Sequence, residues 1–481
     1  MKIKYILTFL ISTFTIFPAF AENSEMPNIV IFMADDFGLG SCGPYGANPD
    51  LVRTPAIDRL AASGLTFDDA YVTASVCSPT RYTMLTGRYS WRTRLKFGVI
   101  NPMDPALIDP GTPTIASFLK DKGYQTSHFG KWHLGYKEKT FKNLLGDLSP
   151  APPDLGFDYH FGVPNNFDDT HKVWIENDRV YGLRSDRISA YGKSFYGKPY
   201  FGYDAPQRNE VEVMQDCTDR AIAWLDQQDK DKPFFIYYGS VAVHHPIMPS
   251  ERMRGTSNAG AYGDFIHDVD YAVGQLVGAL EQRGLLENTI FIFTSDNGGD
   301  IPTDETKPEN QAIKAGLDIN GGKRGDKHLI YEGGLRVPFI VSWPKSIQSG
   351  NRTEAFVTTA DLFATIAEVV SGKVPPAKKA APDSFTFARV LKNPNAESTR
   401  PIGVYRDVHG RKAVRFGDWK YVDNFNYREN KEKGPVELYN LAKDPTESNN
   451  LADTNPEIVQ RGQRLLKAVE DADASRDLKL N

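Results

Sequence analysis

Residues 77–81 (Cys-Ser-Pro-Thr-Arg) bring a thiol and a guanidinium within one helical turn of each other. Ser78 suits a helix N-cap and Pro79 suits the first helical position, so we expect a helix to begin here. Cys77 would then lie just before the helix N-terminus, where backbone N–H groups and the helix dipole favour an anion. Arg81 follows one turn later and can reach back toward Cys77. Alone, the pattern is consistent with a packed thiol or with a thiol of lowered pKa.

Carboxylate and amide side chains follow two short apolar segments. Asp35 and Asp36 come after the first segment, and Asp296 and Asn297 come after the second. Hard oxygen donors of this kind suit Ca²⁺ or Mg²⁺ rather than a transition metal. Either pair alone could equally be a strand-end turn or a helix cap. No cluster of Cys and His residues has the spacing of a zinc site.

Residues 130–135 (Gly-Lys-Trp-His-Leu-Gly) place two more polar side chains after an apolar segment. Alternate residues of an extended chain lie on one side, so Lys131 and His133 would point the same way. The pattern alone is also consistent with a solvated lysine and a packed histidine.

The Cys-x-Pro-x-Arg pattern continues into Thr-Gly-Arg at 86–88. This arrangement resembles the signature of the type I sulfatases, the arylsulfatase A-like members of the alkaline phosphatase superfamily. The resemblance implies that a formylglycine-generating enzyme oxidises Cys77 and that the aldehyde hydrates to a geminal diol. One hydroxyl would attack sulfur and expel the alcohol. Deprotonation of the other would release sulfate and restore the aldehyde.

The same resemblance gives roles to the acidic clusters and extends over most of the chain. It implies one Ca²⁺ ion, with Mg²⁺ as the alternative, bound by the side chains of Asp35, Asp36, Asp296, Asn297 and the modified Cys77.

Three further segments match family patterns that surround the sulfate group. Residues 130–135 match a signature in which the lysine, here Lys131, contacts sulfate and the histidine, here His133, supports the formylglycine. The family's His-x-Pro pattern selects His244 and makes His245 its neighbour.

Residues 324–334 resemble the family's Lys-x₃-Tyr-Glu-Gly-Gly block, which selects Lys327, with Lys323 as the fallback. Lys131, His244 and Lys327 would neutralise charge as the S–O bond breaks. The resemblance places Arg81 in the catalytic set. His244, or alternatively Lys327, would protonate the leaving alkoxide.

These residues need a scaffold that brings distant segments together. Five apolar segments have the composition of buried strands: 28–33, 125–128, 234–238, 289–294 and 337–342. Between them lie five segments of helical pattern: 54–63, 114–122, 209–228, 264–283 and 360–370. The alternation predicts an α/β fold with a large, mainly parallel sheet sandwiched by helices, which the resemblance identifies as alkaline phosphatase-like. In such sheets, ligands bind beyond the carboxyl ends of the strands. Clusters of polar residues follow four of these five segments: 28–33, 125–128, 234–238 and 289–294.

A proline-rich linker at 373–382 separates this pattern from a different one. Strand-like segments at 401–405, 412–415 and 419–422, followed by a helix at 456–474, predict a small antiparallel sheet with a helix. We therefore expect a signal peptide at 1–21, a catalytic domain at 22–375 and a C-terminal subdomain at 376–481. Residues 137–204 have little periodicity and predict an extended excursion that contributes to specificity.

The N-terminus has two lysines, an apolar stretch and an Ala-x-Ala ending at residue 21. It predicts a secretory signal peptide cleaved by signal peptidase, and hence a periplasmic or secreted protein without stable membrane insertion. The apolar run is shorter than the ~20 residues that span a bilayer. Cys42 and Cys217 could pair in an oxidising compartment, or remain buried thiols.

The 481 residues include 56 basic and 61 acidic side chains, and the net charge of −5 argues against nucleic acid as a partner. We expect hydrolysis of sulfate esters on a sulfated carbohydrate, of polysaccharide or glycosaminoglycan type. The alternatives are a phosphatase or phosphonate monoester hydrolase of the same superfamily, and a non-catalytic binder of sulfated glycans. Loops at 137–204, 300–322 and 406–409 would select the sugar.

Overall fold

The structure is a computed structural model that describes residues 26–137 and 143–479. The predicted signal peptide at 1–21 lies outside the described residues. None of the helices in the described part is long and apolar enough to cross a membrane.

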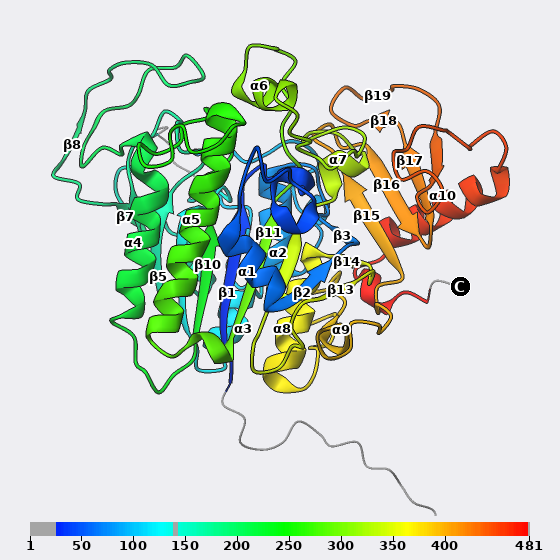
Figure 1. Cartoon of the computed structure of the whole chain (residues 1–481), viewed down its shortest axis with the longest axis horizontal. Helices are drawn as coiled ribbons and strands as arrows, with labels where there is room; N and C mark the ends of the chain where they lie inside the picture. Colours follow the sequence, from blue (N-terminus) through cyan, green and yellow to red (C-terminus); the bar gives the residue numbers. More distant parts are fainter. Residues whose placement is uncertain (1–25, 138–142, 480–481) are drawn as a thin grey trace, which may run out of the picture.

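A ten-stranded sheet forms the centre of the molecule (Figure 1). Across the sheet its strands are β13 (Asn351–Thr353), β2 (Gly64–Phe67), β12 (Phe339–Ser342), β11 (Thr289–Ser295), β1 (Asn28–Ala34), β10 (Phe234–Gly239), β4 (Gln125–Lys131), β5 (Tyr159–Val163), β6 (Ile175–Glu176) and β7 (Arg179–Val180). The five strands from β11 to β5 are parallel, whereas β12, β6 and β7 pair antiparallel to their neighbours. All five predicted strands are present, and the parallel centre confirms the predicted fold class.

Helices cover both faces of this sheet, as its apolar strands require. On β1, Ile29 and Ile31 belong to one buried cluster while Val30 and Phe32 belong to the other. The first cluster includes side chains of α2 (Cys77–Thr86), α3 (Ile115–Lys120) and α8 (Leu362–Ser371). The second includes side chains of α1 (Pro55–Ala62), α4 (Val213–Leu225) and α5 (Gly260–Gln282). The five helical predictions outside the cysteine motif are therefore confirmed.

The predicted cap of α2 is wrong. The helix begins at Cys77 with Val76 in the N-cap position, two residues earlier than Ser78 and Pro79 suggested. The Ser78 hydroxyl instead accepts a hydrogen bond from the Ile100 backbone N–H at 3.1 Å. A tertiary partner has thus replaced the local capping interaction.

The excursion predicted at 137–204 also needs correction, because β5, β6 and β7 within it continue the main sheet. Phe161 and Val163 of β5 belong to one of the two large buried clusters. The strands are short, so their apolar residues give little periodic signal. In its later part, β8 (Ser185–Ile188) pairs with β9 (Tyr203–Asp204) outside the main sheet.

The C-terminal part forms a separate antiparallel sheet, at the right of Figure 1. Its strands are β15 (Ile402–Arg406), β16 (Lys412–Phe416), β17 (Trp419–Asp423) and β20 (Glu437–Asn440), and α10 (Pro456–Asp471) packs on them. The three predicted strands and the helix are confirmed, and β20 is added to them. Buried Lys420 pairs with Glu332 at 3.0 Å and Glu447 at 2.8 Å, which joins this sheet to the larger body.

Shorter elements complete the chain: β3 (Ala70–Tyr71), α6 (Pro308–Lys314), α7 (Glu332–Leu335), β14 (Val357–Thr358), α9 (Ala388–Lys392), β18 (Phe425–Asn426) and β19 (Lys431–Glu432). Val390 and Leu391 of α9 pack in a core cluster of the large sheet. The domain division near 375 stays a prediction. Cys42, Cys77 and Cys217 are all free and buried, so Cys42 and Cys217 do not pair in this structure.

Candidate active site

Four neighbouring parallel strands end at one edge of the large sheet, and each carries predicted site residues at or just after its end. Asp35 and Asp36 follow β1, Lys131 ends β4, His244 follows β10, and Asp296 follows β11. Since β11, β1, β10 and β4 are adjacent and parallel, their carboxyl ends meet. The structure thereby brings together all ten predicted residues: Asp35, Asp36, Cys77, Arg81, Lys131, His133, His244, Asp296, Asn297 and Lys327.

The acidic residues form a compact cluster of oxygen atoms around the cysteine. One ligand atom each from Asp35, Asp36, Cys77 and Asp296 lies within 4.8 Å of the others. Burial, together with the nearby Asp296 and Asp36 carboxylates, raises the pKa of Asp35 to about 8 despite the opposing charges of Lys131 and Arg81. Carboxylates held this close repel one another, so the arrangement favours a cation between them.

Asn297 gives a second, independent indication of a cation. Its Nδ2 donates to Asp36 Oδ1 at 2.8 Å, which aims the amide at the cluster. Its Oδ1 is buried and has no hydrogen-bond partner among the described residues. A buried acceptor without a partner is costly unless something else satisfies it. Three carboxylates and an amide oxygen fit Ca²⁺ or Mg²⁺, and this set of donors does not distinguish the two ions.

Arg81 fixes the relative positions of three chain segments. Its Nε and Nη2 donate to Asp296 Oδ2 at 2.9 and 2.7 Å, and its Nη1 donates to the Lys131 carbonyl at 3.0 Å. The side chain is fully buried. The guanidinium therefore ties the first turn of α2 to the ends of β11 and β4. Cys77 Sγ has its polar contact with Asp35 Oδ1, at 3.7 Å.

Two buried lysines place positive charge beside the acidic cluster. Lys131 Nζ lies 2.6 Å from Asp35 Oδ2, and Lys327 Nζ lies 2.7 Å from Asp36 Oδ2. Burial alone would lower both lysine pKa values, but the facing carboxylates outweigh it and raise them, so both lysines stay charged. Lys323, the fallback, has its charged neighbours elsewhere, among them Arg336 and Glu332.

The imidazoles differ in how their nitrogens are satisfied. His244 Nδ1 lies 2.6 Å from the His245 carbonyl and therefore carries hydrogen, while its Nε2 is 3.8 Å from Asp36 Oδ2. Burial and the charges of Lys327 and Lys131 hold the pKa of His244 well below its usual value, so its resting form is neutral.

Both ring nitrogens of His133 are buried without a partner in the described part of the chain. Burial and the charges of Lys131 and Arg81 lower its pKa as well. His133 and Asp36 have φ near 58°, an uncommon conformation for residues with side chains. Such backbone strain, in a cluster of buried polar atoms without partners, is typical of a binding site.

Sequence reasoning missed Asp300 as a site residue. Its carboxylate lies 3.6 Å from Lys327 Nζ and 3.3 Å from His245 Nδ1. Burial would raise its pKa, yet Lys327 and His245 hold the pKa below its usual value. Asp300 directly follows the Asp-Asn-Gly-Gly segment, and that position was the available signal.

The charges of the cluster decide what it can bind. When all three are ionised, as a bound cation favours, the carboxylates of Asp35, Asp36 and Asp296 cancel the cations Arg81, Lys131 and Lys327. A bound divalent cation would leave this inner set with a net charge of about +2, and Asp300 at its margin would reduce that to about +1. The loaded site would therefore attract an anion although the whole chain is acidic.

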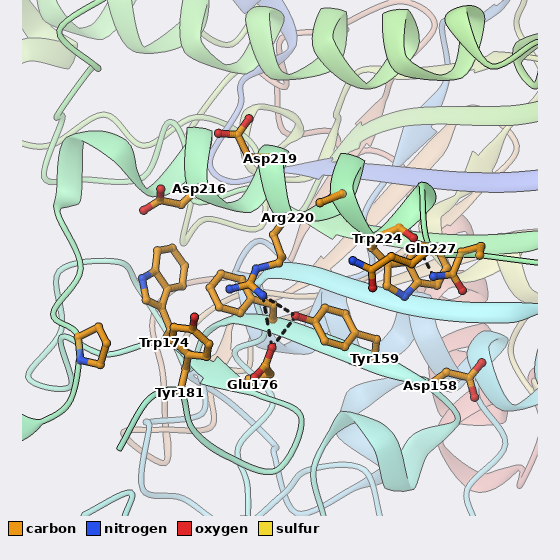
Figure 2. A pocket seen from close by; sticks show the side chains of 14 residues that line it. Asp158, Tyr159, Trp174, Glu176, Tyr181, Asp216, Asp219, Arg220, Trp224 and Gln227 are labelled. Atoms are coloured by element: carbon orange, nitrogen blue, oxygen red, sulfur yellow. Dashed lines mark hydrogen bonds and ion pairs between the residues drawn. The ribbon is translucent and has the colours of Figure 1, made fainter. Parts of the chain in front are cut away.

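A cavity of about 840 Å³ lies elsewhere, between the β5–β7 edge of the sheet and α4 (Figure 2). Four carboxylates line it: Asp158, Glu176, Asp216 and Asp219. Its one lining cation, Arg220, already contacts Glu176 at 3.5 Å and the Tyr159 hydroxyl at 3.4 Å. This acidic groove would repel a sulfate group.

Comparisons with known proteins agree with the strand-end site. The sulfatase family model matches residues 27–372, and the model of the N-sulphoglucosamine sulphohydrolase C-terminal region matches residues 323–473. The chain is 34% identical to an N-acetylgalactosamine-6-O-sulfatase of Bacteroides thetaiotaomicron, over 93% of this chain and 94% of the relative. It is 31% identical to human arylsulfatase A, over 93% and 88% of the two chains.

Comparison of the fold with solved structures also finds a sulfatase. A solved sulfatase structure from work on the metabolism of multiple glycosaminoglycans by B. thetaiotaomicron superposes with a TM-score of 0.84. The match has 32% identity and covers 93% of this chain and all of the other. With this fold, this site and these matches, the chain belongs to the sulfatase family of the alkaline phosphatase superfamily and is a sulfuric ester hydrolase.

Proposed function

We propose that this sulfatase removes the 6-O-sulfate from N-acetylgalactosamine units of a sulfated carbohydrate. The observation that carries the proposal is the buried strand-end cluster, in which two charged lysines face carboxylates around Cys77. The activity for which the bacterial relative is named supports the sugar and the position, because the match covers nearly the whole length of both chains.

Binding of the sulfate group would rest on Lys131 and Lys327, which are charged, buried and already ordered. In a site shielded from water, each such charge stabilises a developing anion more strongly than it would in solution. Arg81 positions the site through Asp296 and does not need to contact sulfate itself.

Asp35, Asp36, Asp296 and Asn297 would hold a divalent cation, with Ca²⁺ the first choice. The metal would supply positive charge that activates the nucleophile and polarises the sulfate group. Conversion of Cys77 to formylglycine by a maturation enzyme would supply a hydrated aldehyde as the nucleophile toward sulfur. His133, whose two ring nitrogens lack partners among the described residues, would hydrogen-bond it.

The leaving alkoxide needs a proton, and the structure supports two donors. His244 has its Nε2 toward the cluster and would have to gain a proton when substrate enters, because its resting form is neutral. Lys327 is already protonated but is bound to Asp36. His244 remains our choice, since the negative sulfate group would raise its pKa on binding.

We also propose that the chain is exported to the periplasm or beyond the cell and loses residues 1–21 to signal peptidase. The sequence of that segment supports the proposal. N-terminal sequencing of the protein recovered from a periplasmic extract tests it, and a cytoplasmic protein that keeps Met1 contradicts it.

Sulfate release from a matched substrate set tests the activity. The enzyme, co-expressed with a formylglycine-generating enzyme, is given 6-O-sulfated and 4-O-sulfated N-acetylgalactosamine, nitrophenyl sulfate and nitrophenyl phosphate. We expect kcat/KM for the 6-sulfate to exceed that for the 4-sulfate by at least about tenfold. Faster turnover of the phosphate would identify a phosphatase or phosphonate hydrolase. Binding of the sulfated sugar without turnover of any ester would identify a non-catalytic binder.

A further inference from the structure

Two adjacent aromatic side chains, Phe195 and Tyr196, are exposed in the segment between β8 and β9. Phe195 is 43% exposed and Tyr196 is 46% exposed, and their rings meet edge to face with centroids 5.3 Å apart. Adjacent exposed aromatic rings commonly mark a place where a ligand binds. We call this pair the aromatic wall.

A chain of contacts connects the aromatic wall to the buried cluster. The Phe195 ring lies 5.1 Å from the ring of His245, whose Nδ1 is 3.3 Å from Asp300, which is 3.6 Å from Lys327 Nζ. Side-chain exposure rises along this chain, from 5% at Lys327 through 14% at Asp300 to 25% at His245. The buried cluster therefore approaches solvent in the direction of the aromatic wall.

The charges of the active-site lysines also act on Tyr196, the second ring of the wall. Burial raises the pKa of the Tyr196 hydroxyl, while the positive charges of Lys327 and Lys131 oppose that rise. The Tyr196 ring also lies beside His245, with ring centroids 6.2 Å apart, so both rings of the wall border the same histidine.

Hydrogen bonds hold the wall in place without covering it. The backbone N–H of Phe195 donates to buried Asp168 at 2.5 Å, and Asn166 Nδ2 donates to the Tyr196 hydroxyl at 3.0 Å. Rings that are ordered before the ligand arrives lose little entropy on binding.

We propose that the aromatic wall of Phe195 and Tyr196 is the subsite that stacks against the sulfated sugar ring, with Tyr196 as the main platform. The inference rests on the proposed function and assigns the residues that would recognise the sugar. A pyranose presents apolar C–H faces and a polar edge, and here exposed rings lie beside the polar atoms of His245 and Asp300. Stacking of this kind would distinguish a carbohydrate ester from bare sulfate.

Kinetics with a ring-containing and a ring-free ligand test the inference. We measure KM for 6-O-sulfated N-acetylgalactosamine, and the inhibition constant of inorganic sulfate, for the variants Tyr196→Ala and Tyr196→Phe. Tyr191→Ala is the matched control, because Tyr191 is 42% exposed in the same segment and its ring contacts Tyr200.

We expect Tyr196→Ala to raise KM for the sugar about three- to tenfold, with the inhibition constant of sulfate unchanged. The KM values of Tyr196→Phe and Tyr191→Ala for the sugar should stay within about twofold of wild type, since both variants keep an aromatic ring at position 196. An unchanged KM for Tyr196→Ala, or an equal loss of sulfate affinity, would overturn the inference. If wild type cleaves nitrophenyl sulfate but no sugar sulfate, the proposed function itself fails, and the inference with it.

Discussion

The strand-end site and the groove beside α4 differ in almost every property that matters for sulfate chemistry. The groove offers about 840 Å³ of space, yet four carboxylates line it and its one lining cation, Arg220, is already paired (Figure 2). The strand-end site is made of buried side chains in which three carboxyl groups face three cations. It also contains acceptors and imidazole nitrogens that lack partners in the described structure.

The difference shows why volume is a poor guide to function in this molecule. The groove has an excess of negative charge that disfavours an anion. The buried cluster instead holds polar atoms without partners among the described residues, and a bound ligand would satisfy them. We therefore expect substitutions in the cluster to affect activity far more than substitutions in the groove.

Substitution of the cysteine should give the largest effect. Cys77→Ala removes the side chain from which the nucleophile would be made, so turnover should fall at least about a thousandfold. Mass spectrometry of the peptide containing Cys77 from active wild type should show formylglycine, with S–H and one hydrogen replaced by a doubly bonded oxygen. Circular dichroism should show that the variant keeps its fold. An active enzyme that carries only the thiol would disprove the mechanism.

Removal of the metal should rank second. Chelation should abolish most activity, and Ca²⁺ should restore it and raise the melting temperature, because a ligand at 100 times its Kd stabilises the folded state by about 2.7 kcal/mol. Asn297→Ala removes the unpartnered oxygen and should reduce this Ca²⁺-dependent shift. Full activity of chelated enzyme, or zinc at full occupancy, would count against the cation that we propose.

The histidine pair should give an intermediate effect that depends on the leaving group. His244→Ala should reduce kcat for a sugar sulfate by about a hundredfold and affect nitrophenyl sulfate much less, since a phenolate departs without a proton. Lys131→Ala should reduce both rates.

The matched control is His245→Ala, which removes the neighbouring imidazole, bound to Asp300 rather than Asp36. Equal losses on both esters for His244→Ala would make it a sulfate contact instead of an acid. A larger selective loss of kcat for His245→Ala would show that the acid is the other histidine.

The smallest effect should come from the groove. Asp216→Asn and Asp219→Asn change the charge of two groove-lining residues on α4. They should leave kcat/KM within about twofold, because surface charges are screened over roughly 10 Å. Progress curves with the sulfated sugar at two salt concentrations measure this. A tenfold loss would mean that the groove contributes to catalysis and that our comparison is wrong.

Much of the site could be predicted because its residues belong to short, dense motifs at strand ends. The motifs of Cys77, Lys131 and Asp296 predicted, without any contact information, side chains that the structure places in one cluster. The parallel centre of the sheet followed from alternating strand and helix patterns.

The errors arose where a distant partner overrides a local preference. Ser78 has the chemistry of a helix cap, but its hydroxyl bonds the backbone of Ile100. In strand β5, His160 and Gly162 interrupt the apolar pattern, and the segment becomes a strand by pairing with β4. Asp300 looks like an ordinary loop residue until Lys327 lies beside it.

The central place of β1 has a consequence for the time course of folding. Asp36 bonds to Asp296, which follows 260 residues later, and to Lys327, 291 residues later. At about 5–20 residues per second, a ribosome needs roughly 13–52 s to make the first of those intervals. During that time the apolar strand β1 cannot pair with both of its neighbouring strands, β10 and β11. A factor that shields the emerging chain should therefore raise the yield of active enzyme more than it raises the activity per folded molecule.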